Sequence, residues 1–226
     1  VLILCKCNIA FAQNNLVPNP SFEDYEVCPY NFYQINYAAP WHTPNIVIEE
    51  SEYYNQCDLT NLVSVPQNWV GLQNANTGIA YAGVYSFRGI TNIREYIETE
   101  LLEELEANKK YCVSFYVSLS DKSNMASDGY GIYFSDTPVI SVDSYYIPVN
   151  PQIENPIGNF LSDKENWMLI SDTFVANGGE KYITIGNFLD DANTNTTYVG
   201  GGVWDFAYYY IDDVSVYYCD KDTSFL

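Results

Sequence analysis

The sequence predicts an all-β protein, a jelly-roll β-sandwich of two antiparallel sheets, on three observations. Apolar and polar residues alternate with a period of two along most of the chain, which is typical of half-buried strands. Aromatic residues are abundant, with 22 Tyr, 11 Phe and 4 Trp among 226 residues. Clusters of Gly, Pro, Asn and Asp separate the alternating segments at short intervals, which favours antiparallel sheets over a parallel α/β fold.

The clearest strand is KYCVSFYVSLS, because its alternation is strict. One face carries an apolar set that we expect in the core: Tyr111, Val113, Phe115, Val117 and Leu119. The other face carries Cys112, Ser114, Tyr116 and Ser118. Similar reasoning predicts strands over residues 16–23, 68–73, 79–87, 93–101, 110–120, 129–135, 166–176, 181–188 and 207–218.

One segment interrupts the strand pattern. LLEELEANKKY places Leu101, Leu102 and Leu105 at helical spacing before a Lys-rich end, so we expect a short connecting helix there.

The length suits one large all-β domain, and no internal repeat or linker divides residues 13–219. The first twelve residues, VLILCKCNIAFA, form an apolar run that ends in a small-x-small pattern, so we interpret 1–12 as a truncated signal peptide. A lipoprotein start at Cys5 or Cys7 is the weaker alternative. Residues 220–226 are interpreted as the start of a linker or a truncated tail. We therefore expect a secreted or cell-surface protein without direct membrane insertion.

The chain is strongly acidic, with 29 Asp and Glu against 9 Lys and Arg and a formal net charge of −20. Nucleic acids and anionic lipids are bound mainly through basic contacts, so both are excluded as expected partners. Such a surface attracts cations, although acidity that only maintains solubility is the simpler interpretation.

Four cysteines remain after the predicted signal peptide, which allows three pairings. Cys28 and Cys57 lie in loop-like segments and form the pair that we expect first. Cys112 and Cys219 lie in strand-like segments, where a disulfide and two buried free thiols remain alternatives.

The strand YYYIDDVSVYY contains two adjacent acids. Simple alternation places Asp212 on the face of Tyr208, Tyr210, Val214 and Val216, and Asp213 on the face of Ile211 and Ser215. A charge among valines is costly unless it is compensated, so we expect a cation at Asp212.

The opening NLVPNPSFE and the closing YYYIDDVSV together resemble the first and last strands of carbohydrate-binding modules with the galactose-binding-like jelly-roll fold. Between them, FYVSLSD and NWMLISDTFVANGGEKYITIGNF look like an export-associated surface domain that recurs in Bacteroidetes. The resemblance covers essentially residues 13–219. It implies a fold more strongly than it implies sugar binding.

The resemblance also implies a structural calcium ion that ties the first strand to the last. Carried onto this chain, its ligands are Glu23 of SFE and Asp212 of IDDV, with Asn76 and Thr77 of the turn NANTG as further candidates. Calcium suits carboxylates from remote strands because it takes six to eight oxygen ligands. Solvated carboxylates at strand ends are the alternative.

Sugar recognition in such modules relies on aromatic rings, so outward or loop aromatics are the candidate ligand-binding residues, with ordinary packing as the alternative for each. We expect Trp41 and Trp167 to pack in the core. The candidates are Tyr116, Trp69, Tyr53, Tyr54 and Trp204, with Tyr145 and Tyr146 as further possibilities.

Enzymatic motifs are missing from the sequence. It has no GxSxG elbow, HExxH helix or phosphate loop, and its one histidine, His42, lies in a Pro-bounded loop without a Cys or His partner nearby. We therefore expect a non-catalytic, calcium-stabilised module that binds a glycan or polysaccharide or mediates adhesion. The alternative is a structural or protein-interaction domain of a larger outer-membrane or secreted assembly.

Overall fold

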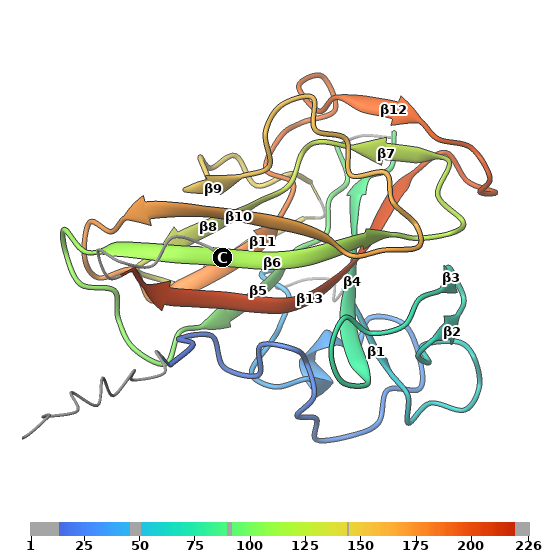
Figure 1. Cartoon of the computed structure of the whole chain (residues 1–226), viewed down its shortest axis with the longest axis horizontal. Coiled ribbons are helices and arrows are strands. Elements are labelled where there is room, and N and C mark those ends of the chain that lie inside the picture. Colours follow the sequence, from blue (N-terminus) through green and yellow to red (C-terminus); the bar gives the residue numbers. More distant parts are fainter. Residues whose placement is uncertain (1–13, 46–50, 90–91, 144, 220–226) are drawn as a thin grey trace, which may run out of the picture.

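The computed structural model describes residues 14–45, 51–89, 92–143 and 145–219. The predicted signal peptide, with Cys5 and Cys7, and the tail 220–226 lie outside these residues. Two sheets dominate the described chain (Figure 1). The larger has the strand order β1-β4-β13-β6-β10 and consists of β1 (Glu52–Asn55), β4 (Ala80–Phe87), β13 (Ala207–Tyr218), β6 (Lys110–Leu119) and β10 (Met168–Val175).

The smaller sheet has the order β5-β11-β8-β9 and consists of β5 (Ile97–Glu100), β11 (Tyr182–Gly186), β8 (Gly131–Ser135) and β9 (Ile153–Glu154). Two short ribbons add β7 (Met125–Ser127) with β12 (Thr196–Tyr198), and β2 (Gln67–Asn68) with β3 (Gly71–Leu72). A single 3-10 turn, η1 (Ile35–Tyr37), is the only helical element among the described residues. Every pairing of these strands is antiparallel, so the predicted fold class is confirmed.

The main core lies between the two sheets. The alternation of β6 is confirmed, because its five predicted inward residues are all buried there. The smaller sheet faces them with Ile97, Ile132, Phe134, Ile183 and Ile185. Trp41 joins the same core, with its ring centroid 5.0 Å from that of Phe22.

A second cluster lies on the outer face of the larger sheet. It contains five tyrosines from three adjacent strands, Tyr54, Tyr81, Tyr85, Tyr208 and Tyr210, and is covered by the segment that carries the β2-β3 ribbon. This part of the sheet is therefore closed to solvent by aromatic packing, and a ligand cannot lie directly on it.

A bulge in β13 changes the side-chain pattern expected for YYYIDDVSV. The pairing with β6 shifts register between Asp212 and Ser215, and Asp213 has a positive φ of 50°. The extra residue rotates the strand, so Val214 and Val216 pack in the main core on the side of Ile211. The prediction that they share a face with Asp212 was wrong.

The predicted helix over 101–111 was also wrong. Its backbone N–H groups bond to other segments: Leu101 to the carbonyl of Lys181, Leu102 to that of Leu16 and Leu105 to that of Glu180. These contacts, with Asn108 at a φ of 61°, replace the helical ladder.

The predicted first strand, 16–23, is irregular, because Asn19 and Phe22 have positive φ and two prolines interrupt the segment. The sequence missed four short strands, β1, β7, β9 and β12, which are too short to show a period.

We predict that side-chain packing on β13, the middle strand of the larger sheet, contributes more to the free energy of unfolding than packing on an edge strand. Ile211→Ala leaves a cavity at a fully buried site and should lower the free energy of unfolding by about 2–5 kcal/mol. Leu169→Ala on the edge strand β10, where the side chain is half exposed, is the matched control and should change it by less than about 0.5 kcal/mol. Urea unfolding of both variants measures the difference, and equal losses would contradict this role for β13.

Candidate functional site

The first candidate site is a cluster of three carboxylates around the turn 76–80. The structure brings together all four predicted calcium ligands, Glu23, Asp212, Asn76 and Thr77. Oε1 of Glu23 accepts hydrogen bonds from the backbone N–H groups of Ile79 at 2.8 Å and Ala80 at 3.1 Å. Gly78, which directly precedes Ile79, has a positive φ, and a Cβ there would collide with the Glu23 carboxylate.

Asp212 is fully buried and bonds to the same turn. Its Oδ2 accepts from the backbone N–H groups of Asn76 at 2.8 Å and Thr77 at 3.3 Å, and its Oδ1 accepts from that of Asp213 at 2.7 Å. Burial, followed by the charge of Asp213, raises the pKa of Asp212 to about 8. The ionised form is therefore costly unless a positive charge is added nearby.

Asp213 bonds to side chains of the same turn and was not among the predicted ligands. Its Oδ1 accepts from the hydroxyls of Ser21 at 2.5 Å and Thr77 at 2.6 Å, and its Oδ2 accepts from Nδ2 of Asn76 at 2.5 Å. The bulge causes this arrangement, because it turns two consecutive acids toward one loop.

The cluster suits calcium in its chemistry but supplies few ligands. Its donors are carboxylate oxygens, which hard cations prefer, and no Lys, Arg or His forms an ion pair with them in the described chain. The described residues contain no group of three or more His, Cys, Asp and Glu that could hold a metal ion. Calcium bound by Glu23 and Asp212 therefore requires further oxygens from the backbone or from Asn76 and Thr77.

The second candidate site is a groove of about 570 Å³ beside the β7-β12 ribbon. The exposed aromatic residues that line it are Trp204, which is 39% exposed, and Tyr198, which is 70% exposed. Arg88 and Asp205 also line it and are exposed. Hereafter it is called the Trp204 groove. Tyr198 and Arg88 were not among the residues predicted from the sequence. The aromatics that flank the glycine run in YVGGGVWDF are the signal that could have indicated Tyr198.

The ring of Trp204 is held by contacts with two other aromatic rings. It stacks on Phe206 with ring centroids 5.3 Å apart, and it contacts Trp69 at 5.5 Å. The Lys122 ammonium lies 5.2 Å from the Trp204 ring centroid. Trp69 itself donates from Nε1 to the hydroxyl of Tyr54 at 3.1 Å, so it supports Trp204 rather than lining the groove.

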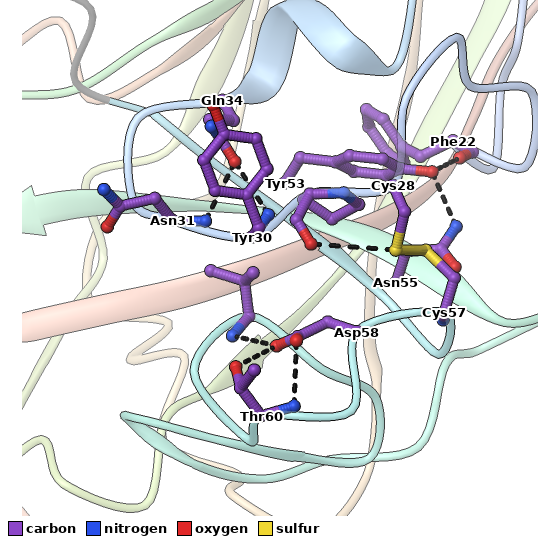
Figure 2. Close-up of a disulfide and its surroundings, with 12 residues drawn as sticks. Phe22, Cys28, Tyr30, Asn31, Gln34, Tyr53, Asn55, Cys57, Asp58 and Thr60 are labelled. Atoms are coloured by element: carbon purple, nitrogen blue, oxygen red, sulfur yellow. Dashed lines mark hydrogen bonds between the residues drawn. A yellow bond between two sulfur atoms is a disulfide. The ribbon is translucent and has the colours of Figure 1, made fainter.

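The prediction that Tyr53 and Tyr54 bind a ligand was wrong. Tyr53 and Tyr54 lie on β1 and are fully buried. The Tyr53 hydroxyl donates to the carbonyl of Phe22 at 2.7 Å (Figure 2), and that of Tyr54 pairs with the hydroxyl of Tyr208 at 2.9 Å. Tyr116 is half-buried on the outer face of β6, in register with Asp212 and away from the groove.

The structure joins both candidate cysteine pairs. Cys28 bonds to Cys57, with Cα atoms 5.9 Å apart, and this bridge ties the loop before η1 to the loop after β1 (Figure 2). Cys112 of β6 bonds to Cys219 directly after β13, with Cα atoms 5.4 Å apart.

His42 forms an ion pair with a buried acid. Its Nε2 lies 3.2 Å from Oε1 of Glu98, whose side chain is fully buried. The other carboxylate oxygen accepts from Thr184 Oγ1 at 2.7 Å and from the N–H of Val139 at 3.0 Å. The hydrogen bond to Glu98 raises the pKa of His42 above its usual value, so folding favours the charged imidazolium.

The described residues form no helix that is long and apolar enough to cross a membrane.

Comparisons with known proteins match the fold but not the sequence. No protein-family model matches the chain, and a search of the curated proteins gave no match. Among solved structures, a cyclase from Fischerella sp. TAU has a TM-score of 0.53 at 16% identity, over 92% of this chain and 98% of that chain. At this identity the likeness shows the shared fold alone.

Two binding domains are also among the similar structures. The CBM22-1 xylan-binding domain from Paenibacillus barcinonensis Xyn10C has a TM-score of 0.47 at 15% identity, over 92% of this chain and 97% of that chain. The K1 cleaved adhesin domain of Lys-gingipain from Porphyromonas gingivalis W83 has a TM-score of 0.44 at 16% identity, over 88% and 96% of the two chains.

We predict a pH-dependent contribution from the His42–Glu98 pair. Because the pKa of His42 is raised in the folded state, its stabilisation is fully present below the unfolded value of about 6.5 and is lost as the pH rises through the folded value. Urea unfolding of the wild type and His42→Gln should therefore differ more at pH 5.5 than at pH 9. A difference that does not change with pH would rule out this ion pair as a contributor.

Proposed function

We propose that this chain is a non-catalytic glycan-binding module of an exported cell-surface protein, and that its binding site is the Trp204 groove. The observation that carries the proposal is the pair of exposed rings, Trp204 and Tyr198, on the walls of one groove. Flat aromatic faces pack well on the apolar C–H faces of sugar rings, and exposing two large rings to water is unfavourable without such a partner.

The polar residues of the groove suit sugar hydroxyls. Arg88 carries only N–H donors, whereas the Asp205 carboxylate carries only acceptors. Together they can therefore donate hydrogen bonds to sugar hydroxyls and accept hydrogen bonds from them. The Arg88 guanidinium lies 4.9 Å from the Tyr85 ring centroid, and Asp205 accepts from Nδ2 of Asn124 at 3.0 Å. Both contacts reduce the side-chain freedom that binding would otherwise have to remove.

Two disulfides support the exported setting, because such bonds persist in oxidising compartments and are rare in the cytosol. The acidic composition supports a neutral polysaccharide as the glycan, since an anionic polymer would be repelled.

We predict that the groove aromatics control polysaccharide binding. Trp204→Ala and Tyr198→Ala should each weaken retention in affinity electrophoresis against a panel of neutral plant and bacterial polysaccharides, by about tenfold, the usual scale for a well-packed aromatic contact. Tyr145→Ala, which removes an exposed ring outside the groove, is the matched control and should bind as the wild type does. The proposal fails if no polysaccharide binds, or if the three variants bind alike.

We also propose that calcium bound by Glu23 and Asp212 stabilises the domain. The support is the charge of three carboxylates around one turn without an ion pair in the described chain, together with the resemblance in the end motifs. The bound ion would compensate this charge and hold the turn 76–80 to Glu23 and to Asp212 of β13.

Thermal melting with calcium and with a chelator tests this. Calcium at a hundredfold excess over its Kd should stabilise the wild type by about 2.7 kcal/mol, and magnesium should not replace it. Glu23→Gln should reduce the calcium response, whereas Glu165→Gln, an exposed acid elsewhere, should retain it. A melting midpoint that is the same with calcium and chelator would disprove the calcium proposal.

One observation favours protein contact as a second function. Exposed apolar side chains flank the Cys28–Cys57 bridge, with Val27 on one side and Leu59, which is 90% exposed, on the other. A rigid loop pair with such side chains suits a docking role in a larger surface assembly.

A further inference from the structure

The structure contains a second cavity, of about 270 Å³, at the end of the smaller sheet. It lies where β8 begins, at Gly131, and where β11 has ended, at Asn187 and Phe188. The loops around Asn155 and Asn193 complete its wall. Hereafter it is called the Asp128 pocket. None of the residues that line it lines the Trp204 groove, so the two sites are separate.

The walls of the Asp128 pocket are fixed by hydrogen bonds. Oδ2 of Asp128 accepts from the N–H of Gly158 at 2.7 Å and from Nδ2 of Asn195 at 2.9 Å. Nδ2 of Asn155 donates to the carbonyl of Asp128 at 2.8 Å. Nδ2 of Asn187, which is buried, donates to the carbonyl of Ser86 at 2.9 Å.

The buried guanidinium of Arg94 holds the loop beside the pocket, which carries Asp191 and Thr194. Arg94, whose side chain is fully buried, pairs with Asp191 at 2.9 Å and donates to Thr194 Oγ1 at 3.1 Å. Asn187 donates to the same hydroxyl at 3.0 Å. The pocket is therefore preformed, which lowers the entropic cost of binding.

The charged groups left over for a ligand are carboxylate acceptors, and the hydroxyl of Tyr130, which also lines the pocket, has no hydrogen-bond partner among the described residues. Within the described chain, Oδ1 of Asp128 and the Glu154 carboxylate have no hydrogen-bond partner, and no Lys, Arg or His lines the pocket. The side chain of Ile157, which is 88% exposed, and that of Leu189 add an apolar rim. A matching ligand is small, rich in hydrogen-bond donors and positively charged, with one apolar face.

We propose that the Asp128 pocket binds a single amine-bearing sugar ring, such as a protonated amino sugar. Its ammonium and hydroxyl groups donate to the carboxylates of Asp128 and Glu154, while its apolar face packs on the rim. An anionic sugar is excluded by the same two charges. The pocket and the Trp204 groove lie at opposite ends of β12, since Asn195 precedes this strand and Tyr198 ends it, roughly 10 Å apart at 3.3 Å per residue.

Amide NMR titration of the full chain at pH 6.5 tests the proposal, with glucosamine, N-acetylglucosamine and glucuronic acid as probes. Glucosamine should shift the amide signals of Gly129, Asn193 and Asn195. It should bind up to about fivefold more tightly than the uncharged N-acetylglucosamine, as expected for one partly exposed charge pair, and glucuronic acid should not bind. Signals of Trp204 and Asp205 report on the groove in the same spectra, so failure at one site is distinguishable from failure at the other.

Glu154→Gln should reduce the preference for the amine, whereas Glu165→Gln, an exposed acid outside the pocket, should retain it. Thermal melting of both variants checks that the fold is unchanged. Equal affinity for the three probes, binding of glucuronic acid, or shifts confined to groove residues would each overturn the proposal.

Discussion

The structure depends on the pairing of its last strand, β13, with strands on both sides. β13 lies between β4 and β6 in the larger sheet, and its inward side chains fill the core between the sheets. The start of the described chain is tied to the same strand: the N–H of Leu16 donates to the carbonyl of Val216 at 2.9 Å, and Nδ2 of Asn15 donates to that of Val214 at 2.9 Å. Hydrogen bonds to β13 thus join the first described residues to the last strand of the domain.

The bulge in β13 also determines where the two acids of this strand lie. By adding one residue at Asp212 and Asp213, it returns Val214 and Val216 to the core and turns two carboxylates toward the turn 76–80. Burial and the charge of Asp213 raise the pKa of Asp212, and the hydrogen bonds that its carboxylate accepts from backbone N–H groups offset this only in part. The same geometry that unites the two ends of the domain therefore concentrates negative charge there.

The outer face of the larger sheet explains where the two candidate binding sites lie. Tyrosines from β1, β4 and β13 are covered by the segment that carries β2 and β3, so this face is used for packing. The Trp204 groove and the Asp128 pocket lie instead beside the short β7-β12 ribbon, in loops that the two sheets hold rigidly. Such placement is common for recognition sites, because loops vary without loss of the core.

The sequence by itself determined the fold class and the inward face of β6, because strand alternation and turn residues act locally. The end motifs were sufficient to bring Glu23, Asp212, Asn76 and Thr77 together as a hypothesis. Only the tertiary structure decided that 101–111 is not a helix and that Tyr53 and Tyr54 are buried. It also placed Trp204 beside Arg88, more than a hundred residues away in the sequence. These outcomes depend on hydrogen bonds and packing between segments that are remote in the sequence, and no local period encodes such contacts.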